Sequence, residues 1–199
     1  MQVQKDEIRN KILTVAEKMF IKEGYENTSL RMIADKCYIS KSNIYRYYKS
    51  KEEIYETLVA PARSHIMRIV DYFTEYRDKY AGIYTEEKVI EISTLLAGLM
   101  AEHRIALLVI LNASGGKDRA VLMKIAEEQL VDGCPIEDQE FKIQVCILLV
   151  TGITDILLKY SDEEKIRERL ILLLQYNFLG LNGVEKINAQ CGLVGSNFW

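Results

Sequence analysis

Histidine, proline and cysteine are scarce in this chain. Its 199 residues include two histidines, two prolines and four cysteines, and the cysteines are scattered without a Cys-x-x-Cys pair. We therefore expect neither a disulfide framework nor a zinc site of the usual spacing. The chain also lacks a glycine-rich phosphate loop, a metal-spaced His, Asp and Glu group and a Ser/His/Asp set, so we predict no enzymatic activity, no bound metal and no cofactor.

Long apolar runs are absent as well. No uncharged apolar run reaches the roughly 18 residues needed to span a bilayer. The first residues, Met-Gln-Val-Gln-Lys-Asp-Glu-Ile, lack the apolar core of a signal peptide. With 49% hydrophobic and 28% charged residues, the composition is that of a soluble globular protein. We expect a cytoplasmic protein without membrane contact.

Charge is distributed unevenly along the chain. Residues 1–51 hold 11 Lys and Arg against 6 Asp and Glu, whereas residues 52–199 hold 15 against 23. A basic amino-terminal quarter on an acidic body suits a small DNA-binding head attached to a part that DNA does not contact.

Hydrophobic spacing predicts an all-α fold, because apolar residues recur at helical intervals. Gly24 is expected to end the first helix, Thr28 to cap the second, and Ser50 with Glu53 to form a capping box that opens a long fourth helix. A second capping box, Ser161 to Glu164, is expected to open the last helix. The predicted helices lie at about residues 5–23, 29–36, 41–47, from 51 onward, and at 86–103, 104–113, 117–131, 138–160 and 162–180.

Two further features of the sequence divide the later part of the chain. Pro135 marks a break between two later helices, and from Leu181 onward the sequence has no clear period, which indicates a loose tail or a short extra element. The patterns together predict a helix-turn-helix head in residues 1–50 and a helical body in residues 51–199.

Residues 28–51 carry the most informative pattern. They read as two short helices joined by a tight turn, and the second helix gathers lysine, asparagine, arginine and three tyrosines before running into Lys49 and Lys51. Tyrosine hydroxyls and lysine ammonium groups bond phosphates without reading sequence, whereas asparagine and lysine also reach base edges in the major groove. A generic three-helix cluster with a solvated face is the alternative, but it leaves the three tyrosines unexplained.

An ordered string of residues runs from the first predicted helix to the start of the fourth: Ile12-Leu13-x-x-Ala16, Phe20-x-x-x-Gly24-Tyr25, Thr28-Ser29-x-x-x-Ile33-Ala34 and Ser40-Lys-Ser-Asn-Ile-Tyr45-Arg-Tyr47-Tyr48-Lys-Ser-Lys51. In this string, residues 8–55 resemble the TetR family of transcriptional regulators. The resemblance implies a three-helix helix-turn-helix head on a larger all-α body that binds a small molecule and dimerises through its last two helices.

The resemblance also implies roles at matched positions. The phosphate-contacting positions are Thr28, Tyr45, Tyr47 and Lys51. The positions that touch base edges are Lys41, Ser42 and Asn43, and Arg46 fits either role. Ser40 is expected to cap the recognition helix. The residues expected to pack are Ile12, Ala16, Phe20, Ile33, Ala34, Ile39, Ile44 and Tyr48.

One position departs from the family pattern. Cys37-Tyr38-Ile39-Ser40 stands where the family usually reads Ala-Gly-Val-Ser. Tyr38 therefore occupies a place where glycine commonly supplies a positive φ, which costs a bulky residue more. Either the turn adopts another conformation or it carries strain.

The body contains a candidate partner surface. Residues 145–158 and 170–174 are apolar nearly all round, and such a helix must be covered on both sides. One side can pack on its own body and the other on a second subunit, so we predict a homodimer through the helices at about 138–160 and 162–180. A helix buried within a monomer is the alternative. Two heads roughly 34 Å apart would then read an inverted-repeat operator.

Candidates for a ligand site are isolated residues. Asp155 stands alone among apolar residues, where a buried acid would need a cationic ligand or an interface partner. His103 is one of two histidines, and a structural bond is the alternative to a ligand contact. An aromatic stripe at Tyr72, Phe73, Tyr76, Tyr80 and Tyr84 is interpreted as packing. The candidate ligand-lining residues are Met67, Met100, His103, Asn112, Phe141 and Asp155.

The pattern as a whole predicts a DNA-binding transcriptional regulator, most simply a repressor that a small-molecule effector releases from double-stranded DNA. The alternatives are a helical small-molecule-binding protein or enzyme with an incidental helix-turn-helix, and an architectural DNA binder that does not choose its sequence.

Overall fold

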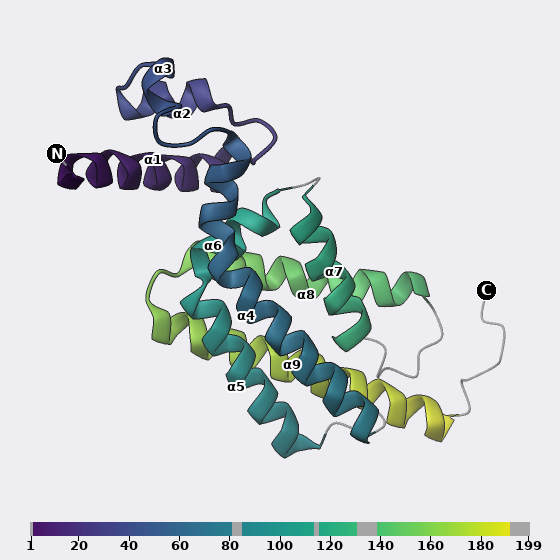
Figure 1. Ribbon diagram of the computed structural model, residues 1–199. Coiled ribbons are helices and arrows are strands. Elements are labelled where there is room, and N and C mark those ends of the chain that lie inside the picture. Colours follow the sequence, from purple (N-terminus) through teal and green to yellow (C-terminus); the bar gives the residue numbers. More distant parts are fainter. Residues whose placement is uncertain (1, 81–84, 114–115, 131–138, 192–199) are drawn as a thin grey trace. The chain divides into compact units, whose positions relative to one another are not determined.

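The computed structural model describes residues 2–80, 85–113, 116–130 and 139–191. Every regular element in these ranges is a helix, which confirms the predicted all-α fold (Figure 1). The helices are α1 (Gln2–Glu23), α2 (Leu30–Cys37), α3 (Lys41–Ile44), α4 (Lys51–Tyr80), α5 (Glu86–Glu102), α6 (Arg104–Leu111), α7 (Lys117–Leu130), α8 (Gln139–Lys159) and α9 (Glu163–Cys191).

Two compact units divide the chain. The first comprises residues 1–67 and 103–120, and the second comprises residues 68–102 and 121–199. One boundary lies inside α4, so the beginning of that helix belongs with α1, α2, α3, α6 and the first turn of α7. The helix-turn-helix is thus part of a compact unit that is larger than the three helices alone.

A shared core holds α1, α2 and α3 together. The buried stripe of α1 recurs every four residues, which places its members on one face of the helix, toward α2. Tyr48 is fully buried as well, and its hydroxyl accepts a hydrogen bond of 3.2 Å from Nε of Arg9 on α1. Ile39 is half-buried, and the other seven residues predicted to pack are buried, namely Ile12, Ala16, Phe20, Ile33, Ala34, Ile44 and Tyr48.

Two predicted helix boundaries are confirmed. Gly24 follows α1 with φ +87°, a conformation that glycine adopts without steric cost. The Oγ of Ser50 accepts a hydrogen bond of 3.1 Å from the N–H of Glu53 at the start of α4. The carboxylate of Glu53 accepts from the N–H of Lys49 at 2.6 Å, so the return bond of this capping box reaches one residue further back than expected.

Two other predicted caps are wrong by one residue. Ser29, not Thr28, caps α2, because its backbone is extended and its Oγ accepts from the N–H of Met32 at 3.3 Å. Asp162, not Ser161, caps α9 by accepting from the N–H three residues on at 3.0 Å. In both places two adjacent residues with short polar side chains can cap a helix, and their capping preferences are too similar for the sequence to rank them.

The last helix is longer than predicted. α9 runs to residue 191, whereas a tail or short element was expected from residue 181 onward. Glycines at 180 and 183 lower the helix propensity by roughly 1 kcal/mol each, which does not suffice to end a helix supported by neighbouring turns. The predicted break at Pro135 and the side chains of the aromatic stripe at residues 72–84 lie outside what the structure describes.

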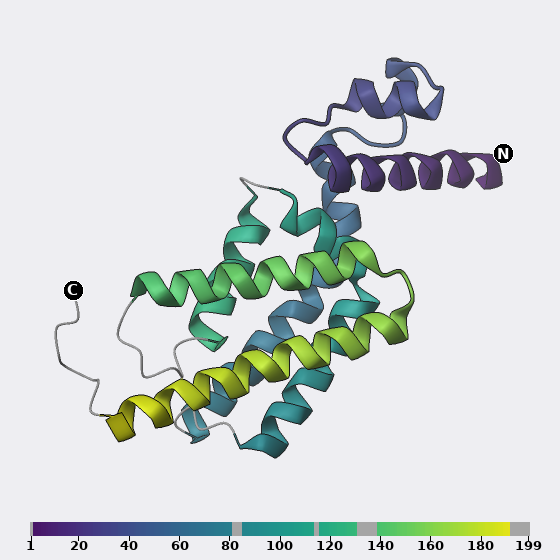
Figure 2. The ribbon, with the colours of Figure 1, turned by 180° about the vertical axis from the view of Figure 1, so that it is seen from behind.

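In the second unit, α9 packs on both α5 and α8, and Figure 2 shows α8 and α9 side by side. Gly152 of α8 permits a close approach, because a Cβ atom there would lie 3.1 Å from Cδ2 of Leu173. The inner faces recur at intervals of three and four residues. They consist of Cys146, Leu149, Ile153 and Leu157 on α8 and Ile166, Leu170, Leu174 and Phe178 on α9.

The outer faces of α8 and α9 remain apolar and exposed. The exposed apolar residues are Phe141, Ile143, Ile147, Leu148 and Leu158 on α8, and Leu172, Tyr176 and Leu179 on α9. Among the described helices, α8 has the length and apolar composition that would suffice to cross a membrane, although core helices of other proteins share both properties. The sequence predicted that both sides of α8 are covered. Within a single chain the inner side is covered and the outer side is exposed.

Candidate nucleic-acid interface

Ser40 fixes the entrance of the recognition helix. Its backbone is extended, and its Oγ accepts a hydrogen bond of 3.2 Å from the N–H of Asn43, which confirms the predicted cap. The hydroxyl of Ser42 lies 3.0 Å from that of Ser40. This cap places residues 41–43 at the amino terminus of α3, the end from which recognition helices contact base edges.

The turn between α2 and α3 is centred on Tyr38. With φ 58° and ψ 38°, Tyr38 is the one non-glycine residue with positive φ in the described part of the chain. Its N–H bonds to the carbonyl oxygen of Asp35, and the N–H of Ile39 bonds to that of Ala34, both at 3.1 Å. This is the Schellman arrangement, in which glycine is usual. Of the two conformations left open by the sequence, the turn adopts the one that suits glycine.

The recognition helix is shorter than predicted. α3 ends at Ile44 instead of continuing to residue 47. The chain then continues in tight turns, in which the N–H of Tyr47 bonds to the carbonyl oxygen of Ile44 at 3.0 Å. Such i to i−3 bonds are those of 3₁₀ turns, so the chain keeps turning in the same sense with fewer residues per turn.

The segment from residue 41 to residue 47 displays most of the predicted DNA contacts. Lys41, Ser42, Tyr45 and Arg46 are exposed, and Asn43 and Tyr47 are half-buried. Within the described residues, the side chains of Lys41, Tyr45 and Arg46 have no hydrogen-bond or ion-pair partner. Two cations and a phenol hydroxyl are therefore available on one short segment to phosphates or base edges.

Thr28 and Lys51 differ from these residues, because their polar groups are bonded inside the unit. Thr28 is 2% exposed, and its hydroxyl donates to the carbonyl oxygen of Gly24 at 2.8 Å. The Nζ of Lys51 donates to the carbonyl oxygens of Tyr25 (2.6 Å) and Thr28 (2.7 Å) and lies 4.1 Å from the Tyr25 ring centroid. Burial lowers the pKa of Lys51. Two of its three N–H groups thus hold the loop between α1 and α2.

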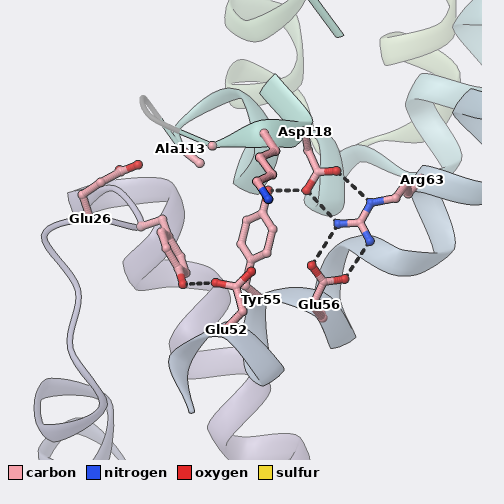
Figure 3. A pocket seen from close by; sticks show the side chains of 10 residues that line it. Glu26, Glu52, Tyr55, Glu56, Arg63, Ala113 and Asp118 are labelled. Atoms are coloured by element: carbon pink, nitrogen blue, oxygen red, sulfur yellow. Dashed lines mark hydrogen bonds and ion pairs between the residues drawn. The ribbon is translucent and has the colours of Figure 1, made fainter. Parts of the chain in front are cut away.

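A cavity of about 470 Å³ opens in the first unit beside α4 (Figure 3). Four carboxylates and two basic side chains line it, together with two tyrosines. The lining residues are Tyr25, Glu26, Glu52, Tyr55, Glu56, Arg63, Ala113, Gly116, Lys117 and Asp118. None of them was singled out as a ligand candidate by the sequence.

Arg63 is the centre of the hydrogen-bond network in this cavity (Figure 3). Its guanidinium donates to both carboxylate oxygens of Asp118 at 2.7 Å and to the carboxylate of Glu56 at 2.7 and 3.1 Å. The hydroxyl of Tyr55 donates to Asp118 at 2.9 Å. The hydrogen bonds from Arg63 lower the pKa of Asp118, and burial raises the pKa of Tyr55, as does its bond to Asp118. The network ties α4 to the start of α7.

The sequence-derived ligand candidates lie elsewhere. Asp155 is exposed on α8 within the single chain, so its prediction as a contact to a ligand or to an interface partner stays a prediction. Asn112 donates its amide to the carbonyl oxygen of Leu108 at 2.8 Å and thereby closes the end of α6. Met67 and Phe141 are exposed, and Met100 and His103 are half-buried.

His103 has a neighbour that the sequence did not predict. The Nδ1 of His65 on α4 faces the Nε2 of His103, and the two ring centroids are 4.5 Å apart. These are the two histidines of the chain, and 38 residues separate them. The sequence has no spacing pattern that would predict their contact, and the only available signal was that the chain contains just two histidines.

Comparisons with known proteins agree with this geometry. Residues 12–58 match the model of the family described as bacterial regulatory proteins, tetR family. The chain is 25% identical over 79 residues to YfiR of Bacillus subtilis, an uncharacterized HTH-type transcriptional regulator, and 23% identical over 91 residues to the HTH-type transcriptional regulator UidR of Escherichia coli. These matches cover 40% and 46% of this chain, and 38% and 43% of the relatives, so the chain spans about two fifths of the length of the curated relatives it matches.

The fold has a counterpart among solved structures. A member of the TetR transcriptional regulator family from Streptomyces coelicolor A3 aligns with a TM-score of 0.51 at 20% identity, over 84% of this chain and 89% of that chain. At this identity the match speaks for the fold. The family model on residues 12–58, the two curated regulators and the capped helix-turn-helix identify the chain as a member of the TetR family.

Proposed function

We propose that the protein is a repressor that binds an inverted-repeat operator as a homodimer and leaves it when a small-molecule effector binds. The observation that carries the DNA-binding part is the exposed segment 41–47, in which Lys41, Tyr45 and Arg46 have no side-chain partner among the described residues. Base contacts are assigned to Lys41, Ser42 and Asn43. A cytoplasmic location and the absence of a catalytic role belong to the same proposal.

Phosphate contacts are assigned to the residues that flank this set. Tyr45 and Tyr47 can offer phenol hydroxyls, and Arg46 can offer a guanidinium. Lys51 can offer its third N–H, because two are bonded to carbonyl oxygens. For Thr28 a direct contact would require its buried hydroxyl to turn away from Gly24.

Dimerisation through α8 and α9 is supported by their exposed apolar faces. Leu148 is 71% exposed and Tyr176 is 80% exposed, on helices that pack side by side. Contiguous apolar surface of this kind marks an interface. Gln144, Thr151 and Asp155 are exposed among the apolar residues of α8, and such polar groups favour a protein partner over lipid, where each would be costly. A second copy of the chain also accounts for Asp155 as an interface residue.

The release mechanism we propose is a shift between two populations. The effector favours a conformation in which α4 tilts, so that the two heads no longer match successive major grooves. α4 is suited to this role because it begins directly after the head, at the cap formed by Ser50. The effector site is proposed to lie in the body, with Met67, Met100, His103, Asn112, Phe141 and Asp155 as candidates.

Selection of bound sites from random DNA tests the proposal most directly. We expect the full chain to recover a palindrome, because two related heads bind two related half-sites. Recovery of DNA without a common sequence would indicate an architectural binder, and recovery of nothing would favour a helical ligand-binding protein or enzyme. Addition of cell extracts fractionated by size then tests the effector, because an effector must change the affinity for the recovered site.

The dimer has its own test with a matched control. Leu148→Lys introduces a charge on the outer face of α8, and we expect it to convert the dimer to a monomer in light scattering after gel filtration. Ile90→Lys, on α5, changes an apolar residue that is 54% exposed and should leave the dimer intact. A wild-type chain that elutes as a monomer at micromolar concentration contradicts the proposal.

A further inference from the structure

The two histidines of the chain meet in the first unit. His65 lies on α4, and His103 occupies the residue before α6, with φ −103° and ψ 24° and without a side-chain hydrogen bond that caps the helix. The Nδ1 of His65 and the Nε2 of His103 face each other within hydrogen-bonding reach. Since the chain has two histidines in 199 residues, their pairing across 38 positions requires an explanation.

We propose that His65 and His103 bind a divalent transition-metal ion of the Zn²⁺, Co²⁺ or Ni²⁺ type. Neutral imidazole nitrogens are the donors that these ions prefer. Two imidazoles leave coordination positions for water or for a small-molecule donor.

The ring geometry fits this assignment. The rings are tilted by 49° with centroids 4.5 Å apart, so they meet at their nitrogen-bearing edges instead of stacking. Two imidazole nitrogens on one tetrahedral Zn²⁺ lie about 3.3 Å apart, since each Zn–N bond is about 2.0–2.1 Å long. The two nitrogens are closer than that in the pair, and a small rotation about the side-chain bonds admits the ion. Both residues are half-buried, so an ion can reach them from solvent.

Without metal, the two imidazoles form a direct hydrogen bond with each other. One neutral imidazole then donates its N–H to the unprotonated nitrogen of the other. Both facing nitrogens must be unprotonated to act as ligands, so in the metal-bound form each neutral ring carries its N–H on its other nitrogen.

The test is a titration of the full, tag-free chain with Co²⁺ in the absence of DNA. We expect one ion per chain and a visible absorption spectrum typical of nitrogen and oxygen ligands. His65→Gln and His103→Gln should each weaken metal binding by at least about 100-fold. Loss of a residue that only orients a metal ligand already costs up to about 100-fold, and loss of the ligand itself should cost more. Glu87→Gln, at an exposed position on α5, should not weaken binding.

Three results would contradict the site. The first is that the chain takes up no Co²⁺ saturably at millimolar concentration, and the second is that uptake is unchanged in both histidine variants. The third is an intense near-ultraviolet band from thiolate-to-cobalt charge transfer, which would assign the ion to cysteines. Because a histidine variant can fail to fold, imidazole NMR of the wild-type chain gives a second test. Co²⁺ should shift or broaden the signals of both histidines at one equivalent, and unchanged signals contradict the site.

The position of the site suggests a regulatory use that rests on the proposed function. An ion held by His65 and His103 ties α4 to the start of α6 within the first unit, and α4 begins directly after the head. We expect Zn²⁺ to change the affinity for the recovered operator at least fivefold in the wild type but not in His103→Gln. An unchanged affinity refutes the regulatory use while the titration decides the site, and a chain that recovers no operator refutes the proposed function alone.

Discussion

Two parts of the first unit use the same residue types for different purposes. In the segment 38–47, lysine, arginine and tyrosine side chains are exposed, and Lys41, Tyr45 and Arg46 have no side-chain partner among the described residues. Around the cavity beside α4, Arg63 is held by two carboxylates. Lys51 nearby is held by two backbone carbonyl oxygens.

The difference lies in where each polar group finds its hydrogen bonds. A buried or half-buried cation must be paired inside the protein, since an unpaired one is costly to desolvate. An exposed cation keeps its water until a phosphate replaces that water. Residue type therefore does not tell which cation is bonded inside the protein, whereas burial and pairing do.

The largest effect should come from replacing the anchored lysine. Lys51→Met removes two charge-assisted hydrogen bonds and leaves the carbonyl oxygens of Tyr25 and Thr28 without their donor. We expect a loss of about 3 kcal/mol in the free energy of unfolding, measured by urea denaturation. Lys41→Met, an exposed lysine without a partner, should change it by less than about 0.5 kcal/mol. Equal losses would erase the distinction between the two lysines.

Next in size is the loss of the ion pair at the cavity. Asp118→Asn weakens both bonds from Arg63, and we expect a cost of about 2 kcal/mol at pH 7. The pKa of Asp118 lies below its ordinary value of 3.8 in the folded chain, so the stability from this pair is present above that value and is lost as the pH falls through the folded pKa. The wild-type and variant unfolding free energies should therefore converge between about pH 5 and about pH 2.

A control for the ion pair exists in the same unit. Arg31 and Asp35 form an exposed pair on α2 at 3.9 Å, with both side chains at least 70% exposed. Asp35→Asn should cost less than about 0.5 kcal/mol at any pH, since exposed pairs contribute little. Convergence with pH in this variant, and none in Asp118→Asn, would contradict the assignment.

A smaller effect is expected for single contacts with DNA. Lys41→Ala and Asn43→Ala should each weaken binding to the selected operator about tenfold, and they should relax base choice at the positions they face. Tyr45→Phe removes a phosphate-binding hydroxyl and should weaken all sequences alike. Lys22→Ala, on α1 with a side chain 82% exposed, is the control and should not change operator affinity. Gel-shift titrations at fixed salt measure all four.

The parts of the fold that the sequence predicted are those with local signals. The stripe of α1, the caps at Ser40 and Ser50 and the glycine after α1 each depend on residues within a few positions of one another. The choice between Thr28 and Ser29 as cap failed, because adjacent hydroxyl side chains compete on nearly equal terms.

The parts that escaped prediction depend on distant pairs. Arg63 meets Asp118 across 55 residues, and His65 meets His103 across 38. No local periodicity brings such residues together, since their contact follows from how the helices pack. Lys51 was assigned to phosphate from its type and position alone, and its two carbonyl partners in the preceding loop became visible only in the structure.

The smallest effect concerns the strained turn, and its sign is the opposite of the others. Tyr38 holds a left-handed conformation that costs a non-glycine residue roughly 1–2 kcal/mol. Tyr38→Gly relieves this cost, but it adds backbone entropy to the unfolded chain and removes the contact with Lys11, whose ammonium lies 5.6 Å from the ring centroid. The net expectation is a stabilisation of about 0.5 kcal/mol in urea denaturation.

Tyr38→Ala separates the two contributions, because alanine keeps the Cβ atom that makes the conformation costly and loses the ring. It should therefore destabilise slightly, by about 0.5 kcal/mol. Since the ring is 90% exposed next to the recognition helix, its retention at a cost in stability is the pattern expected of a residue kept for an external contact. If Tyr38→Gly is more stable but binds the operator as tightly as the wild type, then the ring makes no such contact. Tyr38 would then be neither an exposed side chain that contacts DNA nor a side chain that anchors the fold.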